Sequence, residues 1–262
     1  MVKKTRVDLL LVEHGLAESR SLAQRLVMAG QVRANGQVVD KPSSKVAEDV
    51  ELSVESGPRF VSRGGEKLQA AFEFFDLEVM DLVCADVGAS TGGFTDCLLQ
   101  HGATRVYAID VGQGILQWKL RNDSRVVVME STNARFLEQL PEPVDFVTID
   151  ASFISLKILL PVVRGWEPGQ VLILIKPQFE AGRKEVARGK GVVRDPEVHQ
   201  RVLQDVLNFA EHNDYQIKGL ARSPVLGPKG NVEFLGWLGI CSDDRSADIS
   251  LNKLVSDVIK GD

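Results

Sequence analysis

Residues 82–100, LVCADVGASTGGFTDCLLQ, decide the fold of this chain. The run at 83–87 is mostly apolar and predicts a buried strand, and residues 88–93 that follow it are all small. Apolar residues then recur at helical spacing, at Phe94, Cys97 and Leu98. A strand, a small turn and a helix in this order hold a ligand against the backbone at a helix N-terminus, at the carboxyl edge of a parallel sheet.

The composition of the turn separates two nucleotide-type cofactors. The dinucleotide fingerprint needs a glycine at position 90, where a pyrophosphate presses on the backbone, but this chain has Ser90. No lysine follows the last glycine, so the turn is not a P-loop. An acidic residue before the first glycine suits an ammonium group, such as the methionine end of S-adenosylmethionine; an ordinary tight turn is the alternative. The candidate cofactor residues in this stretch are Asp86, Gly88, Ser90, Thr91, Gly92 and Gly93.

Size and composition predict a globular protein with one large and one small domain. The chain has 262 residues, of which 44% are hydrophobic and 26% charged. No apolar run approaches the roughly 20 residues that span a bilayer, and the short N-terminal run is broken by Glu13 and His14. Three cysteines without metal spacing favour core packing over a metal site. We therefore expect a cytoplasmic protein with no bound metal.

Charge is distributed unevenly along the chain. The net charge is −5, yet residues 1–45 carry eight lysines and arginines against four acidic residues, which is +4 and leaves −9 for the rest. A basic segment beside an acidic body is the pattern of a localised RNA-backbone contact, although solvated helix charges would give the same count.

Residues 6–60 predict a small α+β unit. A helix begins at Val7 and ends at Gly15, and a second begins after Ser19 and ends at Gly30. Short strands at 31–34 and 37–40 flank Asn35-Gly36, a strong hairpin signal, and a last strand follows at 50–54.

This unit resembles the S4-type RNA-binding domain over residues 6–52. The resemblance rests on the R-x-D-x-x-L-x-x-x-G-L opening, Ser19-Arg20-Ser21, Ala29-Gly30-Gln31-Val32 and the Asn35-Gly36 turn. It implies RNA binding by basic residues on the helix pair, with Lys4, Arg6, Arg20, Arg25 and Arg33 as candidates. We expect the domain to occupy 1–57, a linker 58–65, and a second domain 66–262.

The second domain alternates strands and helices, which predicts a mostly parallel, doubly wound sheet. The last two strands have no clear helix between them, which indicates an antiparallel hairpin at one edge. Seven strands with that ending fit an α/β fold, the Rossmann-like methyltransferase architecture, and residues 248–260 predict a helix packed on it. The strands are expected near 83–87, 105–110, 125–129, 144–150, 170–175, 216–222 and 232–239.

Polar residues at strand ends are the candidates for chemistry. Asp110 ends the second strand and suits a clamp on ribose hydroxyls, or it caps the next turn. Asn133 follows the third strand and could contact adenine, although loop asparagines usually form turns. Asp150 ends the fourth strand, and with Phe153 it also resembles the site of base-amino methyltransferases, though without their prolines.

Two further residues stand out beside buried strands. Lys176 leaves the apolar run 171–175, so its ammonium is expected in the cleft; a lysine leaving the core for solvent is the alternative. Glu233 lies inside an apolar strand and needs a cationic partner.

Lys67, Asp150, Lys176 and Glu233 together resemble, in sequence order, the Lys-Asp-Lys-Glu tetrad of FtsJ-related ribose 2′-O-methyltransferases. The whole chain resembles the TlyA (hemolysin A) family of ribosomal RNA methyltransferases. The segments that carry this are VSRGGEKL, DVGASTGGFTDCLLQ, IDVGQG, NAR, IDASFISL, IKPQFEAGR, KGVVRDP and GPKGNVEF, with a local departure at 113–115.

The resemblance implies S-adenosylmethionine-dependent 2′-O-methylation of cytidine in 16S or 23S ribosomal RNA, or in both. Lys176 would act as base or oxyanion stabiliser, and Asp150 and Glu233 would hold the two lysines. The basic loop at 180–195 is expected either to be disordered or to clamp RNA, with Arg63, Arg183 and Lys190 as candidates. Base methylation by Asp150 and Phe153 is one alternative; membrane lysis is another, without a suitable segment in the sequence.

Overall fold

Two short helices and two small sheets make up the N-terminal unit, residues 1–59, of the computed structural model. Ser19 Oγ accepts a hydrogen bond from Leu22 N at 3.2 Å and so begins the second helix. Asn35 and Gly36 have φ values of 50° and 78°, as a two-residue hairpin turn requires. The elements are β1 (Lys4–Arg6), α1 (Val7–Glu13), α2 (Arg20–Met28), β2 (Val32–Ala34), β3 (Gln37–Val38), β4 (Lys45–Ala47) and β5 (Leu52–Val54).

The described residues are 3–55, 57–240 and 250–261. Cys241 and the first residues of the helix expected over 248–260 therefore lie outside the described part of the chain.

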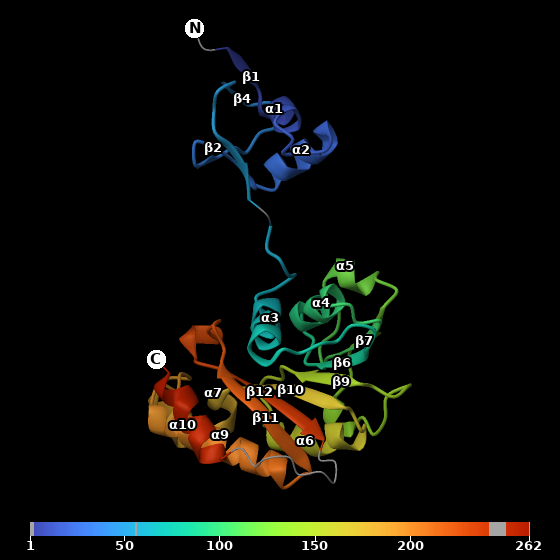
Figure 1. The fold of residues 1–262 in the computed structure, drawn as a ribbon, viewed down its shortest axis with the longest axis vertical. Coiled ribbons are helices and arrows are strands. Elements are labelled where there is room, and N and C mark those ends of the chain that lie inside the picture. Colours follow the sequence, from blue (N-terminus) through green and yellow to red (C-terminus); the bar gives the residue numbers. More distant parts are fainter. Residues whose placement is uncertain (1–2, 56, 241–249, 262) are drawn as a thin grey trace. The chain divides into compact units, whose positions relative to one another are not determined.

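A seven-stranded sheet forms the centre of the C-terminal unit, residues 60–262 (Figure 1). Its strand order is β11-β12-β10-β9-β6-β7-β8, and β12 runs antiparallel to both of its neighbours. This confirms the predicted parallel sheet with an antiparallel hairpin at one edge. The strands are β6 (Val83–Val87), β7 (Arg105–Ile109), β8 (Val126–Met129), β9 (Phe146–Ile149), β10 (Gln170–Ile175), β11 (Tyr215–Arg222) and β12 (Phe234–Ile240).

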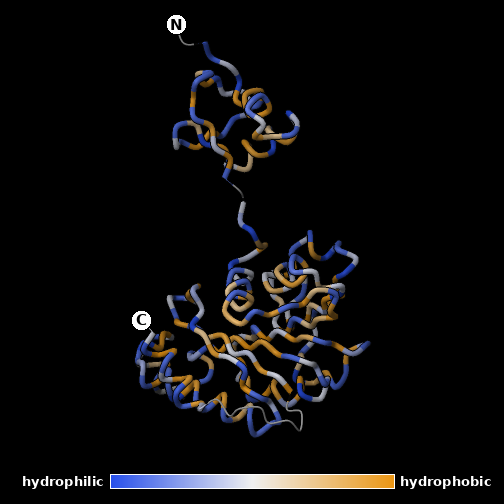
Figure 2. The backbone as a smooth tube through the Cα atoms, viewed as in Figure 1, coloured by the Kyte–Doolittle hydropathy of each residue, from blue (hydrophilic) through white to orange (hydrophobic). Residues whose placement is uncertain are grey.

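Helices cover both faces of this sheet, and the central strands are correspondingly hydrophobic (Figure 2). Alternation along β6 explains the two layers, because Cys84 faces one core and Ala85 and Val87 face the other. α6, α9 and α10 pack on the side of Ala85, and α3 and α4 on the side of Cys84. The helices are α3 (Gly64–Phe75), α4 (Gly93–Gln100), α5 (Trp118–Arg121), α6 (Leu156–Gly165), α7 (Pro177–Glu180), α8 (Arg183–Arg188), α9 (Pro196–Glu211) and α10 (Leu251–Lys260), with 3₁₀ turns η1 (Ala134–Phe136) and η2 (Pro228–Gly230).

The segment expected as a linker at 58–65 is in part packed structure. Phe60 is 2% exposed, and its ring packs against Gly65. A Cβ atom at position 65 would lie only 2.2 Å from Cγ of Phe60. Val61 N donates to Asp96 Oδ2 at 2.9 Å, and α3 begins at Gly64 rather than near Glu66. Phe60 and Val61 therefore belong to the packed C-terminal unit, within the range expected as a linker.

The topology fixes where polar side chains gather. β6, β7, β9 and β10 are parallel, so their carboxyl ends lie at one edge of the sheet. β12 runs the opposite way, so its first residue is at that same edge, with Phe234 opposite Ile175. Gly88 and the side chains of Asp110, Asp150, Lys176 and Glu233 are therefore brought to one edge.

Candidate active site

The turn after β6 is packed too tightly for larger residues. Gly88 has a φ of 89°, and a Cβ there would lie 2.7 Å from the backbone oxygen of Asp150. Gly92 has a φ of 98°, and a Cβ there would meet Leu120 at 2.2 Å. These two positions require glycine on both conformational and steric grounds.

A cavity of about 690 Å³ lies beside this turn. Asp110 lines it, and its two carboxylate oxygens accept from Ser90 N at 2.8 Å and Gly112 N at 2.7 Å. Asn133 also lines it, while its side-chain oxygen accepts from Arg135 N at 3.2 Å. Of the predicted cofactor residues, this cavity is lined by Gly88, Ser90, Asp110 and Asn133, and the neighbouring one of about 320 Å³ by Gly88, Ser90, Thr91 and Gly93.

Asp86, predicted as a cofactor residue, lies in the core beneath the glycine turn. Its side chain is fully buried, and Thr95 Oγ1 and Thr148 Oγ1 donate to its two oxygens at 2.7 and 3.0 Å. Burial raises the pKa of this carboxyl to about 7. In the described part of the chain Asp86 and Gly92 line neither cavity, and the Asp86 carboxylate joins β6 to α4 and β9.

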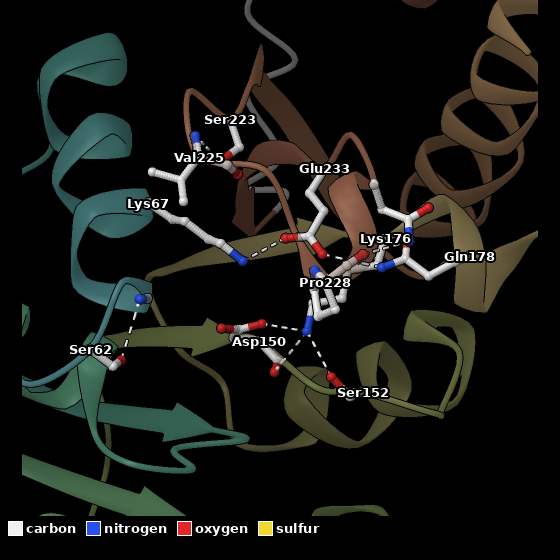
Figure 3. Close-up of polar contacts among 12 residues, drawn as sticks. Ser62, Lys67, Asp150, Ser152, Lys176, Gln178, Ser223, Val225, Pro228 and Glu233 are labelled. Carbon is white, nitrogen blue, oxygen red and sulfur yellow. Dashed lines mark hydrogen bonds and ion pairs between the residues drawn. The ribbon is translucent and has the colours of Figure 1, made fainter. Parts of the chain in front are cut away.

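The smaller cavity brings together the four residues of the predicted tetrad (Figure 3). Lys67 comes from α3, and the other three lie at the sheet edge: Asp150 after β9, Lys176 after β10 and Glu233 before β12. Lys67 Nζ is 2.6 Å from Glu233 Oε2, and Lys176 Nζ is 2.5 Å from Asp150 Oδ1. We call these two ion pairs the lysine–carboxylate cluster.

The Lys176 ammonium has one ion-pair partner and two hydrogen-bond acceptors. Besides Asp150 Oδ1, it donates to the Asp150 backbone oxygen at 3.3 Å and to Ser152 Oγ at 3.0 Å. Burial raises the pKa of the Asp150 carboxyl, and the charges of Lys176 and Lys67 oppose that rise. When the pKa of a carboxyl beside an ammonium is raised, a proton can move between the two groups.

Two polar contacts of the cluster were missed by the sequence analysis. Ser152 occupies a position where the base-amino methyltransferases have proline. A hydroxyl two residues after Asp150 was the available sign that it contacts the cluster. Gln178 donates to Glu233 Oε1 at 3.2 Å, a contact between residues 55 positions apart that no local pattern in the sequence reveals.

Phe153, three residues after Asp150, has an unusual backbone conformation. Its φ is 64°, a strained value for a bulky side chain, and it is 91% exposed. Its ring lies 4.9 Å from that of Phe179, centroid to centroid. The aromatic residue is thus displayed at the sheet edge rather than packed in the core.

The predicted RNA-binding arginines of the N-terminal unit do not all converge. Arg6 and Arg20 both donate to the buried carboxylate of Asp8, as does Gln24, and we call these four residues the Asp8 cluster. Arg33 instead pairs with Glu55. Arg25 contacts Ser21, and Lys4 is exposed.

In the C-terminal unit, Arg63 is exposed at the start of α3 and lines the smaller cavity. Lys190 is also exposed, in a loop that contains the short helices α7 and α8 rather than only irregular chain. The side chain of Arg183 lies outside the described atoms.

The described residues offer neither a candidate membrane-spanning helix nor a cluster of metal-ligating side chains. They contain no helix with the length and apolar character needed to cross a membrane. They also contain no group of three or more His, Cys, Asp and Glu side chains that could hold a metal ion.

Comparison with known proteins agrees with this geometry. A family described as FtsJ-like methyltransferase matches residues 60–240, and the S4 domain matches residues 5–52. YqxC of Bacillus subtilis (strain 168), which carries an rRNA methyltransferase name, is 52% identical over 242 residues, 89% of this chain and 85% of that protein.

TlyA of Mycobacterium tuberculosis (strain CDC 1551 / Oshkosh), named 16S/23S rRNA (cytidine-2′-O)-methyltransferase, is 45% identical over 249 residues, 93% of this chain and 92% of that protein. A solved structure from Streptococcus thermophilus, which carries a hemolysin name, is 44% identical with a TM-score of 0.71, and the match covers 99% of this chain and 97% of that one. The chain therefore belongs to the TlyA family, FtsJ-like methyltransferases with an N-terminal S4 domain.

Proposed function

We propose that this protein transfers a methyl group from S-adenosylmethionine to the 2′-hydroxyl of a cytidine in ribosomal RNA of one or both subunits, in the cytoplasm. The observation that carries the proposal is the lysine–carboxylate cluster, which lines a cavity directly beside the glycine turn. The name of the Mycobacterium tuberculosis relative supports the choice of cytidine and of ribosomal RNA.

The residues of the larger cavity fit the proposed methyl donor. Gly88 lines both cavities without a side chain, so a ligand can approach the backbone there. Asp110 is fixed by two backbone N–H groups, and its oxygens keep lone pairs for ribose hydroxyls. Asn133 would offer an amide to adenine. When bound, S-adenosylmethionine supplies an electrophilic methyl group on its sulfonium.

Lys176 and Asp150 would take up the proton that the ribose hydroxyl must lose. An ammonium has no lone pair and cannot accept a proton, but Asp150 Oδ1 lies 2.5 Å from Lys176 Nζ and burial raises the pKa of the Asp150 carboxyl. A proton shared toward Asp150 leaves the Lys176 nitrogen able to accept the hydroxyl proton. As the O–C bond forms and the C–S bond breaks, that proton stays on the Lys176–Asp150 pair.

Lys67 would stabilise negative charge on the attacking oxygen. Its ammonium lines the same cavity and is held by Glu233 at 2.6 Å, so it needs no reorganisation when charge develops. The RNA itself would be held by the Asp8 cluster, together with Lys4, Arg25, Arg33, Arg63, Arg183 and Lys190 as further candidates.

The decisive experiment incubates the purified protein and S-adenosylmethionine with ribosomal subunits that lack the modification. The RNA is then digested to nucleosides and analysed by mass spectrometry. We expect 2′-O-methylcytidine that depends on Lys176. A methyl group on the base would instead establish base methylation by Asp150 and Phe153. RNA that carries no new methyl group at all would overturn the proposal.

A further inference from the structure

Gln178 occupies an unusual position for an amide. It lies in the short helix α7, directly after Lys176 and Pro177, and is 9% exposed. Its Nε2 donates to Glu233 Oε1 at 3.2 Å, and Figure 3 shows the two side chains pointing toward each other. Because a carboxylate only accepts, this contact fixes which way the amide faces.

Each of the two oxygens of the Glu233 carboxylate accepts a hydrogen bond. It is fully buried, and in the described part of the chain two hydrogen bonds reach it: Lys67 on Oε2 and Gln178 on Oε1. Gly227 leaves room for it, since a Cβ at that position would lie 2.0 Å from Oε1. The carboxylate therefore has one defined orientation, in which its other oxygen faces Lys67.

The amide oxygen of Gln178 has no hydrogen-bond partner among the described residues. A buried acceptor left unpaired lowers stability, and an apolar side chain of similar volume would avoid that loss. The residue is therefore poorly explained as part of the packing. Its one favourable polar contact is the bond to Glu233.

We infer that Gln178 is a positioning residue for the methyl transfer, acting on Lys67 through Glu233. The inference rests on the proposed function. Without the amide, Glu233 Oε1 loses its donor, and the carboxylate is free to turn away from Lys67. The ammonium would then lose its fixed place at the attacking oxygen, while the cofactor cavity and the RNA-binding residues would be untouched.

The test compares Gln178→Met, which keeps side-chain volume and removes the donor, with the full-length wild type in a steady-state assay on ribosomal subunits. The free energy of a hydrogen bond to a charged group corresponds to a change in rate of about 10- to 100-fold. We expect kcat to fall by a factor in this range. KM for the RNA and Kd for S-adenosylmethionine should stay within about twofold. Gln69→Met is the matched control, because Gln69 donates to Glu73 at 2.8 Å on α3, outside the cavity lining.

A double-mutant cycle separates positioning from a loss of structure. In a Glu233→Gln background, Gln178→Met should cost less than about twofold, because the group it acts on is already altered. An equal loss in both backgrounds, an unchanged kcat, or a loss confined to KM would overturn the inference. If the wild type itself fails to methylate ribose, the proposed function fails instead, so the two failures are distinguishable.

Discussion

The Asp8 cluster and the lysine–carboxylate cluster use buried carboxylates in opposite ways. In the first, the Asp8 side chain is 0% exposed while those of Arg6 and Arg20 are 36% and 53% exposed. In the second, the cations are inside as well, with the Lys67 and Lys176 side chains 10% and 8% exposed. Exposed guanidinium groups that a buried acid holds in place can still meet phosphates, whereas buried ammonium groups reach only what enters the cavity. The first arrangement suits recognition, and the second suits proton chemistry.

The largest effect should come from removing a buried cation. Lys176→Ala deletes the proposed base and leaves Asp150 buried without its partner, so we expect methyl transfer to fall by at least about 1,000-fold. S-adenosylmethionine binding, measured by calorimetry, should persist, because Lys176 lines only the smaller of the two cavities. Lys253→Ala, at an exposed lysine of α10, is the control. Retained transfer by the Lys176 variant would remove the distinction between the two clusters.

Removing the exposed cations should change binding instead of chemistry. Arg6→Gln combined with Arg20→Gln should weaken RNA affinity by about 10- to 100-fold and lower the slope of log Kd against log salt by about one per lost phosphate contact. At saturating RNA, kcat should stay within about twofold. Lys41→Gln serves as the control, since Lys41 is an exposed lysine of the same unit and is not one of the candidate RNA-binding residues. A fall in kcat with unchanged affinity would contradict the recognition role.

Sequence periodicity predicted the strands, the glycine turn and the residues that leave buried strands, because these depend on neighbours along the chain. It did not reveal the partners of Asp86, because Thr95 and Thr148, which donate to its two oxygens, come from other elements of the fold. Gln178 contacts a residue 55 positions away, so no local pattern reveals it. The pairing of β1 with β4 was missed as well, because each strand has three residues and no apolar run.

Acid should weaken the N-terminal unit through Asp8. Hydrogen bonds from Arg6 hold the pKa of this carboxyl well below its usual range, so its contribution is complete above the unfolded value of about 4 and is lost as pH falls further. Asp8→Asn should therefore destabilise the unit by about 1–2 kcal/mol at pH 7, after allowing for the exposed arginines. Hydrogen exchange of the backbone amides in α1 and α2 measures the free energy of unfolding of this unit. The difference from wild type should shrink below pH 4, and a pH-independent difference would exclude the ionised pair as its source.

Asp86 should respond to pH in the opposite sense, because its partners are hydroxyls and not cations. Burial raises its pKa to about 7, so between pH 4 and 7 the folded state holds a proton that the unfolded state has released, and stability falls as pH rises. Asp86→Asn mimics the protonated form and should stabilise the C-terminal unit by about 1 kcal/mol at pH 8, with little change at pH 4. Thermal unfolding across this range measures it, and cofactor affinity should change less than about threefold, since Asp86 lines neither cavity in the described chain. A gain at pH 4 equal to that at pH 8 would show that packing, and not the buried charge, distinguishes this carboxylate from Asp8.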